Sequence, residues 1–419
     1  MSDKQYLCID LKSFYASVEC VERGLDPMTT DLIVADPDRT DKTICLAVSP
    51  SMKAKGVKNR CRVFEIPKDM EYITAPPRMQ KYIDYAAEIY EIYLGYFSNE
   101  DIHVYSIDEV FIDVTHYLWL YKSTAKELAV KLMEEIYEKV GVRATCGIGT
   151  NLYLCKIALD ITAKHSPDFI GFLDEEKFIK TMWEHKPLTD FWRIGKGTAE
   201  RLARYGIYTM GDIAKTPEDV LYNWFGIDAE LLIDHAYGRE PTTIKDIKNY
   251  KARSNCVTSG QVLMRDYTFL EARLILKEMI DLICLDLVAK RLITDSVTIY
   301  VGYSNSLNIK GAKGTAHIPV KTNSDSMILP EVLNVYDKVV NSEYPVRRII
   351  ITCNRVSEDL GATQLTLFED ANKNSAIQET VLKIKAKYGK NSILKGMNYL
   401  DAATTRERNR QIGGHKSGE

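Results

Sequence analysis

Two short apolar runs flank an adjacent pair of acids in Ile102-His-Val-Tyr-Ser-Ile-Asp-Glu-Val-Phe-Ile-Asp-Val114. Two strand-like runs separated by a few polar residues are typical of a β-hairpin, so we expect Asp108 and Glu109 at its tip. Near the N-terminus, the apolar segment Tyr6-Leu-Cys-Ile-Asp10 also resembles a strand that ends in a carboxylate. The sequence therefore predicts three acids at the ends of strands.

Three such acids suit divalent cations. Magnesium prefers hard oxygen ligands and commonly binds through a few carboxylates together with substrate phosphates. If Asp10 faces Asp108 and Glu109 from a neighbouring strand, the three could hold two ions about 3.5–4 Å apart. The alternative is that the Asp-Glu pair simply ends a strand at the surface, and the pattern alone does not separate the two interpretations.

The fold class expected is α+β with several domains, because 419 residues are too many for one compact core. Strand-like and helical segments alternate up to about residue 166, and residues 167–240 look helical throughout. The polar, proline-led stretch 241–253 is typical of a linker. A second α+β unit is expected at 254–357, followed by a polar, flexible tail at 358–419 with one weakly helical stretch, 375–388.

Composition restricts the class of protein further. Residues 1–249 hold 31 basic and 40 acidic side chains, whereas residues 250–419 hold 24 and 18. This asymmetry suits an enzyme with a metal site in one half and a phosphate-binding surface in the other, and ordinary surface variation would also produce it. Nine cysteines without paired spacing argue against zinc and for a reducing compartment. Without an apolar run of ~20 residues or a signal peptide, we expect a cytoplasmic protein with no membrane partner.

Three strings closely resemble the Y-family DNA polymerases. They are Cys8-Ile-Asp-Leu-Lys-Ser-Phe-Tyr-Ala-Ser-Val-Glu19, Tyr105-Ser-Ile-Asp-Glu-Val-Phe-Ile-Asp-Val114 and Cys146-Gly-Ile-Gly-Thr-Asn-Leu-Tyr-Leu-Cys-Lys-Ile-Ala158. The resemblance covers about residues 4–360 and is greatest to the UmuC branch of Gram-positive bacteria. It implies a right-hand polymerase with a palm (1–17 and 76–166), small fingers (18–75), a helical thumb (167–240), a linker (241–253) and a little finger (254–357).

The resemblance also implies an activity: template-directed, low-fidelity DNA synthesis past damaged bases, without proofreading, in the DNA-damage (SOS) response. It makes Asp10, Asp108 and Glu109 the metal ligands, assisted by the backbone carbonyl of Leu11. Two Mg²⁺ ions are implied, with Mn²⁺ as a substitute. Glu109 is the acid most directly tied to activating the primer 3′-hydroxyl.

Several residues match the family's nucleotide site. Tyr15, next to Phe14, matches the steric gate, whose flat ring beneath the sugar leaves no room for a 2′-hydroxyl. Without the motif, Tyr15 would be interpreted as a core aromatic. Lys53 and Lys164 are the candidate triphosphate contacts, with a solvated surface charge as the alternative. Lys164 aligns only if one residue is inserted relative to some relatives, and Pro50 replaces a tyrosine that relatives often carry.

The DNA contacts that we expect are with the phosphate backbone, so they would not depend on the base sequence of the DNA. Gly195 and Gly197 lie in a segment that resembles a helix–hairpin–helix, whose backbone amides can bind a phosphate. The alternative is an ordinary turn between helices. In the little finger, cations would contact the DNA backbone with a salt-dependent affinity. These cations are Arg253, Arg265, Lys310, Lys313, Arg347, Arg348 and Arg355.

The pentapeptide Gln364-Leu365-Thr-Leu367-Phe368 resembles the bacterial β-clamp-binding motif, and packing back on the little finger is its alternative. The partners implied are primer-template DNA, deoxynucleoside triphosphate and the β sliding clamp. Some relatives also require a UmuD-like subunit or a RecA-type recombinase. Two alternative functions are a catalytically silent accessory protein and a palm-type nucleotidyl cyclase. The first would lack a metal carboxylate, and the second would not need a clamp peptide.

Overall fold

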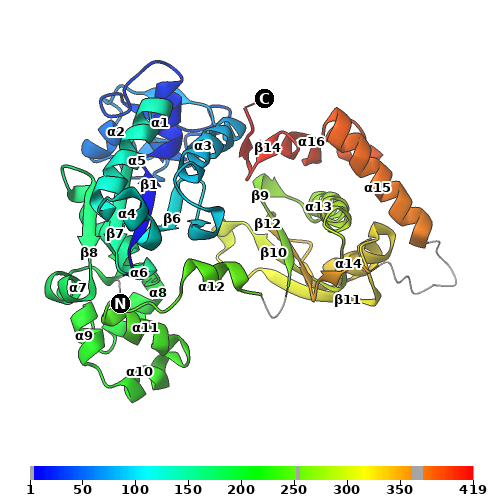
Figure 1. The fold of residues 1–419 in the computed structure, drawn as a ribbon. Coiled ribbons are helices and arrows are strands. Elements are labelled where there is room, and N and C mark those ends of the chain that lie inside the picture. The colour runs from blue at the N-terminus through cyan, green and yellow to red at the C-terminus, as the bar shows by residue number, and fades with distance from the viewer. Residues whose placement is uncertain (1–3, 252–254, 361–370, 419) are drawn as a thin grey trace. The chain divides into compact units, whose positions relative to one another are not determined.

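The computed structural model describes residues 4–251, 255–360 and 371–418. The chain divides into two compact units, Met1–Tyr250 with Lys416–Glu419 and Lys251–His415, and Figure 1 labels their elements. Arg253 and the pentapeptide at 364–368 lie outside the described residues. The α+β class expected from the sequence is confirmed, because both units contain a sheet and helices.

The first unit is built on a five-stranded sheet in the order β5-β6-β1-β7-β8. The central strand β1 runs antiparallel to both β6 and β7, and β8 is parallel to β7. The expected hairpin is formed by β5 and β6, which pair antiparallel. The strand bounds are β1 (Tyr6–Leu11), β5 (Ile102–Val104), β6 (Glu109–Asp113), β7 (Ala144–Gly149) and β8 (Ile170–Leu173).

Helices pack on this sheet because the strand side chains on both of its faces are apolar. Cys8 and Phe111 are buried in one cluster with Leu152 and Cys155 of helix α6. Side chains alternate along a strand, so Leu7 and Ile9 point to the opposite face, where they are fully buried. The helices of this region are α1 (Phe14–Val21), α3 (Met79–Leu94), α4 (Thr115–Tyr121), α5 (Ala125–Val140) and α6 (Leu152–Ile157).

A smaller sheet lies between α1 and α3 in the sequence. Its order is β3-β2-β4, with β2 antiparallel to β3 and parallel to β4. The only α-helix between residues 22 and 78 is the five-residue α2, which Ser49 caps by accepting from the amide of Met52. The bounds are β2 (Leu32–Val34), β3 (Ala47–Val48), α2 (Pro50–Ala54) and β4 (Ile73–Ala75).

The region from 167 to 249 differs from expectation at both ends. Residues 170–173 are not helical: they form β8, which extends the main sheet beside β7. The stretch expected as a linker contains helix α12, which begins after a capping box between Thr243 and Asp246 and buries Ile244. The other helices here are α7 (Glu175–Met182), α8 (Lys196–Ala203), α9 (Met210–Lys215), α10 (Glu218–Phe225), α11 (Asp228–Ala236) and α12 (Ile244–Asn249).

The second unit contains a five-stranded antiparallel sheet in the order β11-β10-β12-β9, with the short β13 also paired with β10. Helices α13 and α14 pack on one face of this sheet. Val297, Ile299 and Val301 of β10 point into this core, so Thr298 and Tyr300 lie on the other face. The bounds are β9 (Val257–Tyr267), α13 (Phe269–Ala289), β10 (Leu292–Tyr303), β11 (Ala312–Thr322), α14 (Asp325–Val339), β12 (Val346–Asn354) and β13 (Ser357–Glu358).

The C-terminal segment is more ordered than the flexible tail expected from its polar composition. Helix α15 (Ala371–Tyr388) contacts α13, and residues 396–412 form short elements: α16 (Thr405–Arg408) and β14 (Gln411–Ile412), which pairs with β15 (His415–Lys416). Glu278 of α13 is 1% exposed, and its carboxylate accepts from the Asn398 side chain at 2.8 Å and from the Thr404 amide at 2.8 Å. A buried carboxylate of α13 thus anchors this segment.

None of the helices within 4–251, 255–360 and 371–418 is both long enough and apolar enough to cross a membrane.

We predict that Glu278→Ala loosens the C-terminal segment. The change leaves the donors of Asn398 and Thr404 buried without an acceptor, which costs about 2–4 kcal/mol. Hydrogen exchange of amides between 396 and 408 should speed up. In the control Asp286→Ala, which removes an exposed acid of the same helix, protection should be unchanged. Equal protection in both variants would contradict the anchoring role.

Candidate active site

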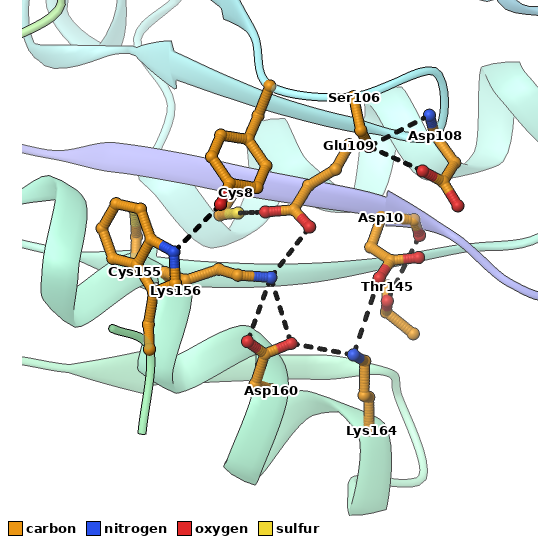
Figure 2. Close-up of polar contacts among 12 residues, drawn as sticks. Cys8, Asp10, Ser106, Asp108, Glu109, Thr145, Cys155, Lys156, Asp160 and Lys164 are labelled. Carbon is orange, nitrogen blue, oxygen red and sulfur yellow. Dashed lines mark hydrogen bonds and ion pairs between the residues drawn. The ribbon is translucent and has the colours of Figure 1, made fainter. Parts of the chain in front are cut away.

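The pairing of β1 with β6 brings two of the acids together. Asp10 and Glu109 are directly opposite residues in this antiparallel pair, so their side chains leave the sheet on the same face. Asp108 immediately precedes β6, and its carbonyl accepts from the amide of Leu11 at 2.9 Å. One local register therefore places three carboxylates at one end of the sheet (Figure 2).

Each of these acids is engaged by a separate polar partner. Glu109 accepts from the ammonium of Lys156 at 2.8 Å. Asp108 accepts from the hydroxyl of Ser106 at 2.6 Å, and Asp10 lies 3.6 Å from the ammonium of Lys164. Figure 2 shows the lysines approaching the acids from the helix that follows β7. The negative charge of the site is thus partly balanced by the chain's own cations.

Burial and mutual repulsion affect the titration of Asp10. Burial is the main cause that raises its pKa to about 6, the charges of Asp108 and Glu109 raise it further, and Lys164 opposes them. The negative charges of Asp108 and Glu109 disfavour the charged form of Asp10. A site of this kind gains stability when a cation binds.

The carboxylates of Asp10, Asp108 and Glu109 are suitable ligands for divalent ions. All three groups are hard carboxylate oxygens on adjacent segments, as Mg²⁺ and Mn²⁺ prefer. Among the residues that the structure describes, no three Asp, Glu, His or Cys side chains are already gathered around one point as ligands. The acids therefore share a location, and their side chains would have to turn from Lys156, Lys164 and Ser106 to coordinate a common ion.

Lys164, which contacts Asp10, lies in a helical segment that is not regularly α-helical. After α6, the chain forms a π-helical turn, η3 (Ala158–Thr162), and then a 3₁₀ turn, η4 (Ala163–His165). A π-turn accommodates one residue more than an α-helical turn, and such turns are frequent at functional sites. A π-turn at this position is consistent with the one-residue insertion expected before Lys164 relative to some relatives.

Lys53 joins the same site from another element. It lies in α2, its side chain is exposed, and its ammonium interacts electrostatically with Asp10, Lys164 and Asp108. Partial desolvation lowers the pKa of Lys53, and the charge of Asp10 opposes that effect. Lys164 thus lies beside Asp10, and Lys53 is near enough to feel the charges of Asp10 and Asp108.

Tyr15 packs on an aromatic ring of another helix, and its neighbour Phe14 is almost fully buried. The Tyr15 ring stacks on Tyr82 of α3 with centroids 4.4 Å apart and planes 15° apart. The Tyr82 hydroxyl donates to the buried carboxylate of Glu19, which also receives a bidentate pair from Arg78. This network fixes the orientation of the Tyr15 ring. Phe14 is 2% exposed and belongs to the core.

Gly195 and Gly197 lie at the start of α8, where Gly195 is the N-cap. A Cβ added at either glycine would meet nothing within 4 Å, so the backbone here is open to an approaching molecule. This arrangement suits the expected phosphate contact, because amides at a helix N-terminus are exposed donors.

The expected cations of the second unit fall into two groups. Arg265, Arg347 and Arg355 form ion pairs with Glu271, Asp266 and Asp295 respectively. Lys310, Lys313 and Arg348 are exposed, and none of them forms an ion pair with an acid in the described part of the chain. Lys313 and Arg348 lie opposite Tyr300 and Gly302 of β10, on strands β11 and β12.

The sequence reasoning missed Lys156 and Asp160. Lys156 was part of a matching string without a role, and Asp160 was not singled out. A usable signal was present: Lys156, Asp160 and Lys164 are spaced four residues apart, and i,i+4 neighbours of opposite charge pair on a helix.

Comparison with known proteins identifies the family. Residues 9–160 match the impB/mucB/samB family model, and residues 256–367 match the model of that family's C-terminal domain. The chain is 32% identical to the "Putative UV-damage repair protein UvrX" of Bacillus subtilis, over 99% of this chain and 98% of that protein. The chain belongs to the impB/mucB/samB family.

Other proteins similar to this chain have polymerase names. The chain is 30% identical to "DNA polymerase IV 2" of Bacillus subtilis and 28% identical to "DNA polymerase IV 2" of Halalkalibacterium halodurans, over 99% of each chain. Its fold matches a solved Y-family DNA polymerase chimera of Dbh and Dpo4, with a TM-score of 0.66, 19% identity and coverage of 84% of this chain and 99% of the chimera. The Y-family resemblance seen in the sequence is confirmed.

Proposed function

We propose that this chain is a DNA-directed DNA polymerase that copies past damaged template bases with low fidelity, by two-metal nucleotidyl transfer and without proofreading. The observation that carries the proposal is the cross-strand position of Asp10 and Glu109, with Asp108 beside them, at one end of the main sheet. Membership of the impB/mucB/samB family and the Y-family fold support it.

The three acids have distinct roles in the proposed reaction. Asp10 and Asp108 would hold two Mg²⁺ ions, or Mn²⁺ in their place, together with Glu109 and the carbonyl of Leu11. When bound, such ions lower the pKa of an attacking hydroxyl and neutralise the leaving pyrophosphate. Glu109 would orient the primer 3′-hydroxyl for in-line attack on the α-phosphorus.

The lysines and Tyr15 select and hold the incoming nucleotide. Lys53 and Lys164 place two positive charges beside the acids, where a triphosphate would lie. Tyr15, stacked on Tyr82, presents a fixed ring against the sugar. A ribonucleotide is rejected because its 2′-hydroxyl would overlap that ring.

Low fidelity follows from the small size of the fingers. We assign the palm to 1–17 and 76–166, the fingers to 18–75, the thumb to 167–240 and the little finger to 254–357. The five-residue α2 is too short to close over a nascent base pair and test its shape. We expect no proofreading, because this assignment contains no exonuclease domain.

We assign DNA binding to two surfaces that would contact the phosphates of the DNA backbone. The open N-terminus of α8 at Gly195 and Gly197 would bind one phosphate, and Lys313 and Arg348 on the helix-free sheet face would bind others. Arg265 and Arg347 are less available because each is paired with an acid. Such contacts would make binding insensitive to sequence and sensitive to salt.

The β sliding clamp is the proposed partner of the pentapeptide at 364–368, and a UmuD-like subunit or a recombinase would be an additional one. The cytoplasm is the proposed location, which agrees with nine cysteines that remain free thiols.

The first test of the polymerase function removes two metal ligands. Asp108→Ala/Glu109→Ala should lower primer extension by about 10³-fold or more, because the ions lose two of their three acids. Primer-template binding, measured by fluorescence anisotropy, should persist. The control Glu134→Ala/Glu138→Ala makes the same charge change on the exposed face of α5 and should extend primers normally. Normal synthesis by the first variant would contradict the assignment.

A second test concerns the sugar. Tyr15→Ala should raise the incorporation of ribonucleotides relative to deoxynucleotides by at least about 10-fold, because the space beneath the sugar opens. Single-nucleotide insertion kinetics measure the ratio. Tyr137→Ala, an exposed tyrosine of α5, serves as the control. Unchanged discrimination by Tyr15→Ala would rule this residue out as the gate.

A third test addresses the clamp. Leu367→Ala/Phe368→Ala should abolish the stimulation of synthesis by the β clamp and leave extension without clamp unchanged, because the anchor side chains are removed. Leu360→Ala, an exposed leucine near the pentapeptide, should remain stimulated. If the double variant responds to the clamp as the unmodified protein does, another segment binds it.

A further inference from the structure

Five side chains beside the proposed metal site alternate in charge: Glu109, Lys156, Asp160, Lys164 and Asp10 (Figure 2). Lys156 donates to Glu109 at 2.8 Å and lies 3.0 Å from Asp160. Lys164 lies 2.8 Å from the same Asp160 carboxylate and 3.6 Å from Asp10. Asp160 therefore receives two ammonium groups, each of which also reaches a proposed metal ligand.

The backbone places Asp160 in this bridging position. It stands in the middle of the π-helical turn η3, four residues after Lys156 and four before Lys164. Each residue of an α-helix advances the side-chain direction by about 100°, so the extra residue of a π-turn reorients everything that follows it. The turn thus lets Lys164 and Lys156 meet one carboxylate from its two sides.

The charges indicate what this carboxylate does. Without it, the two ammonium groups would have only Glu109 and Asp10 as acidic partners, and they would compete with divalent ions for those oxygens. Lys156 and Glu109 are the most enclosed of the five, with side chains 9% and 10% exposed, so their contact is weakly screened by water. Lys164 is more exposed, at 42%, and contacts both Asp160 and Asp10.

We propose that Asp160 is a positioning residue of the metal site, an inference that rests on the proposed function. It draws Lys164 away from Asp10 and shares Lys156 with Glu109. The other Glu109 oxygen accepts from the Cys8 thiol at 3.4 Å, a weak donor that an ion can displace. Residues that orient metal ligands in this way commonly change metal affinity 10- to 100-fold when they are replaced.

The test measures metal binding directly, on the full-length protein without DNA or nucleotide. Mn²⁺ affinity is determined by electron paramagnetic resonance for the unmodified protein, Asp160→Asn, Lys164→Met and the double variant. We expect Asp160→Asn to weaken Mn²⁺ binding about 10-fold, because Lys164 then occupies Asp10. In the Lys164→Met background the same substitution should cost about 3-fold or less, since the competing ammonium is gone.

Three controls separate this role from others. Asp160→Glu keeps the charge and should bind Mn²⁺ within about 3-fold of the unmodified protein. Asp168→Asn removes an exposed acid that pairs with Lys126, away from the five side chains, and should have no effect. Thermal unfolding of each variant shows whether the fold is retained.

The outcomes are distinct. A loss of affinity that is equal with and without Lys164, or no loss in Asp160→Asn, overturns the positioning role. If Asp108→Ala/Glu109→Ala binds Mn²⁺ as tightly as the unmodified protein, the proposed metal site fails instead. Mn²⁺ binding that needs the acids and depends on Asp160 only when Lys164 is present supports both.

Discussion

The antiparallel pairing of β1 with β6 is the constraint on which the site depends. Because opposite residues of such a pair project to the same face, one register places Asp10 against Glu109. A shift of one residue would turn Asp10 to the face opposite Glu109 and force the buried side chains on both faces of the sheet to repack. The buried residues that stabilise the sheet, such as Cys8 and Phe111, therefore also fix the chemistry.

The negative charges of the candidate active site are balanced by lysines of the same chain. Three carboxylates at one end of a sheet repel each other, and the chain supplies Lys156 and Lys164 from the following helix as internal counter-ions. Asp160 in turn balances these lysines. The site thus persists as a network of paired charges whose partners can be exchanged for metal ions and a triphosphate, rather than as a preformed cage of ligands.

Much of this could be predicted from local sequence patterns. Apolar runs that end in Asp10 and flank Asp108 identified the strands, and the structure confirms the hairpin. The missed features depend on contacts between distant segments. Polarity suggested a flexible tail, yet Glu278 of α13 anchors it from 120 residues away in the sequence. The linker helix α12 carried a readable capping box at Thr243, whereas the π-turn around Asp160 had no local signal beyond the spacing of its charges.

The most direct measurement is anomalous diffraction from crystals of the protein with primer-template, an unreactive deoxynucleotide analogue and Mn²⁺. The account predicts two manganese peaks about 3.5–4 Å apart, both within coordination distance of Asp10, Asp108 or Glu109 and of the triphosphate. Manganese bound elsewhere, or carboxylates still paired with Lys156 and Lys164 while the nucleotide is in place, would contradict it.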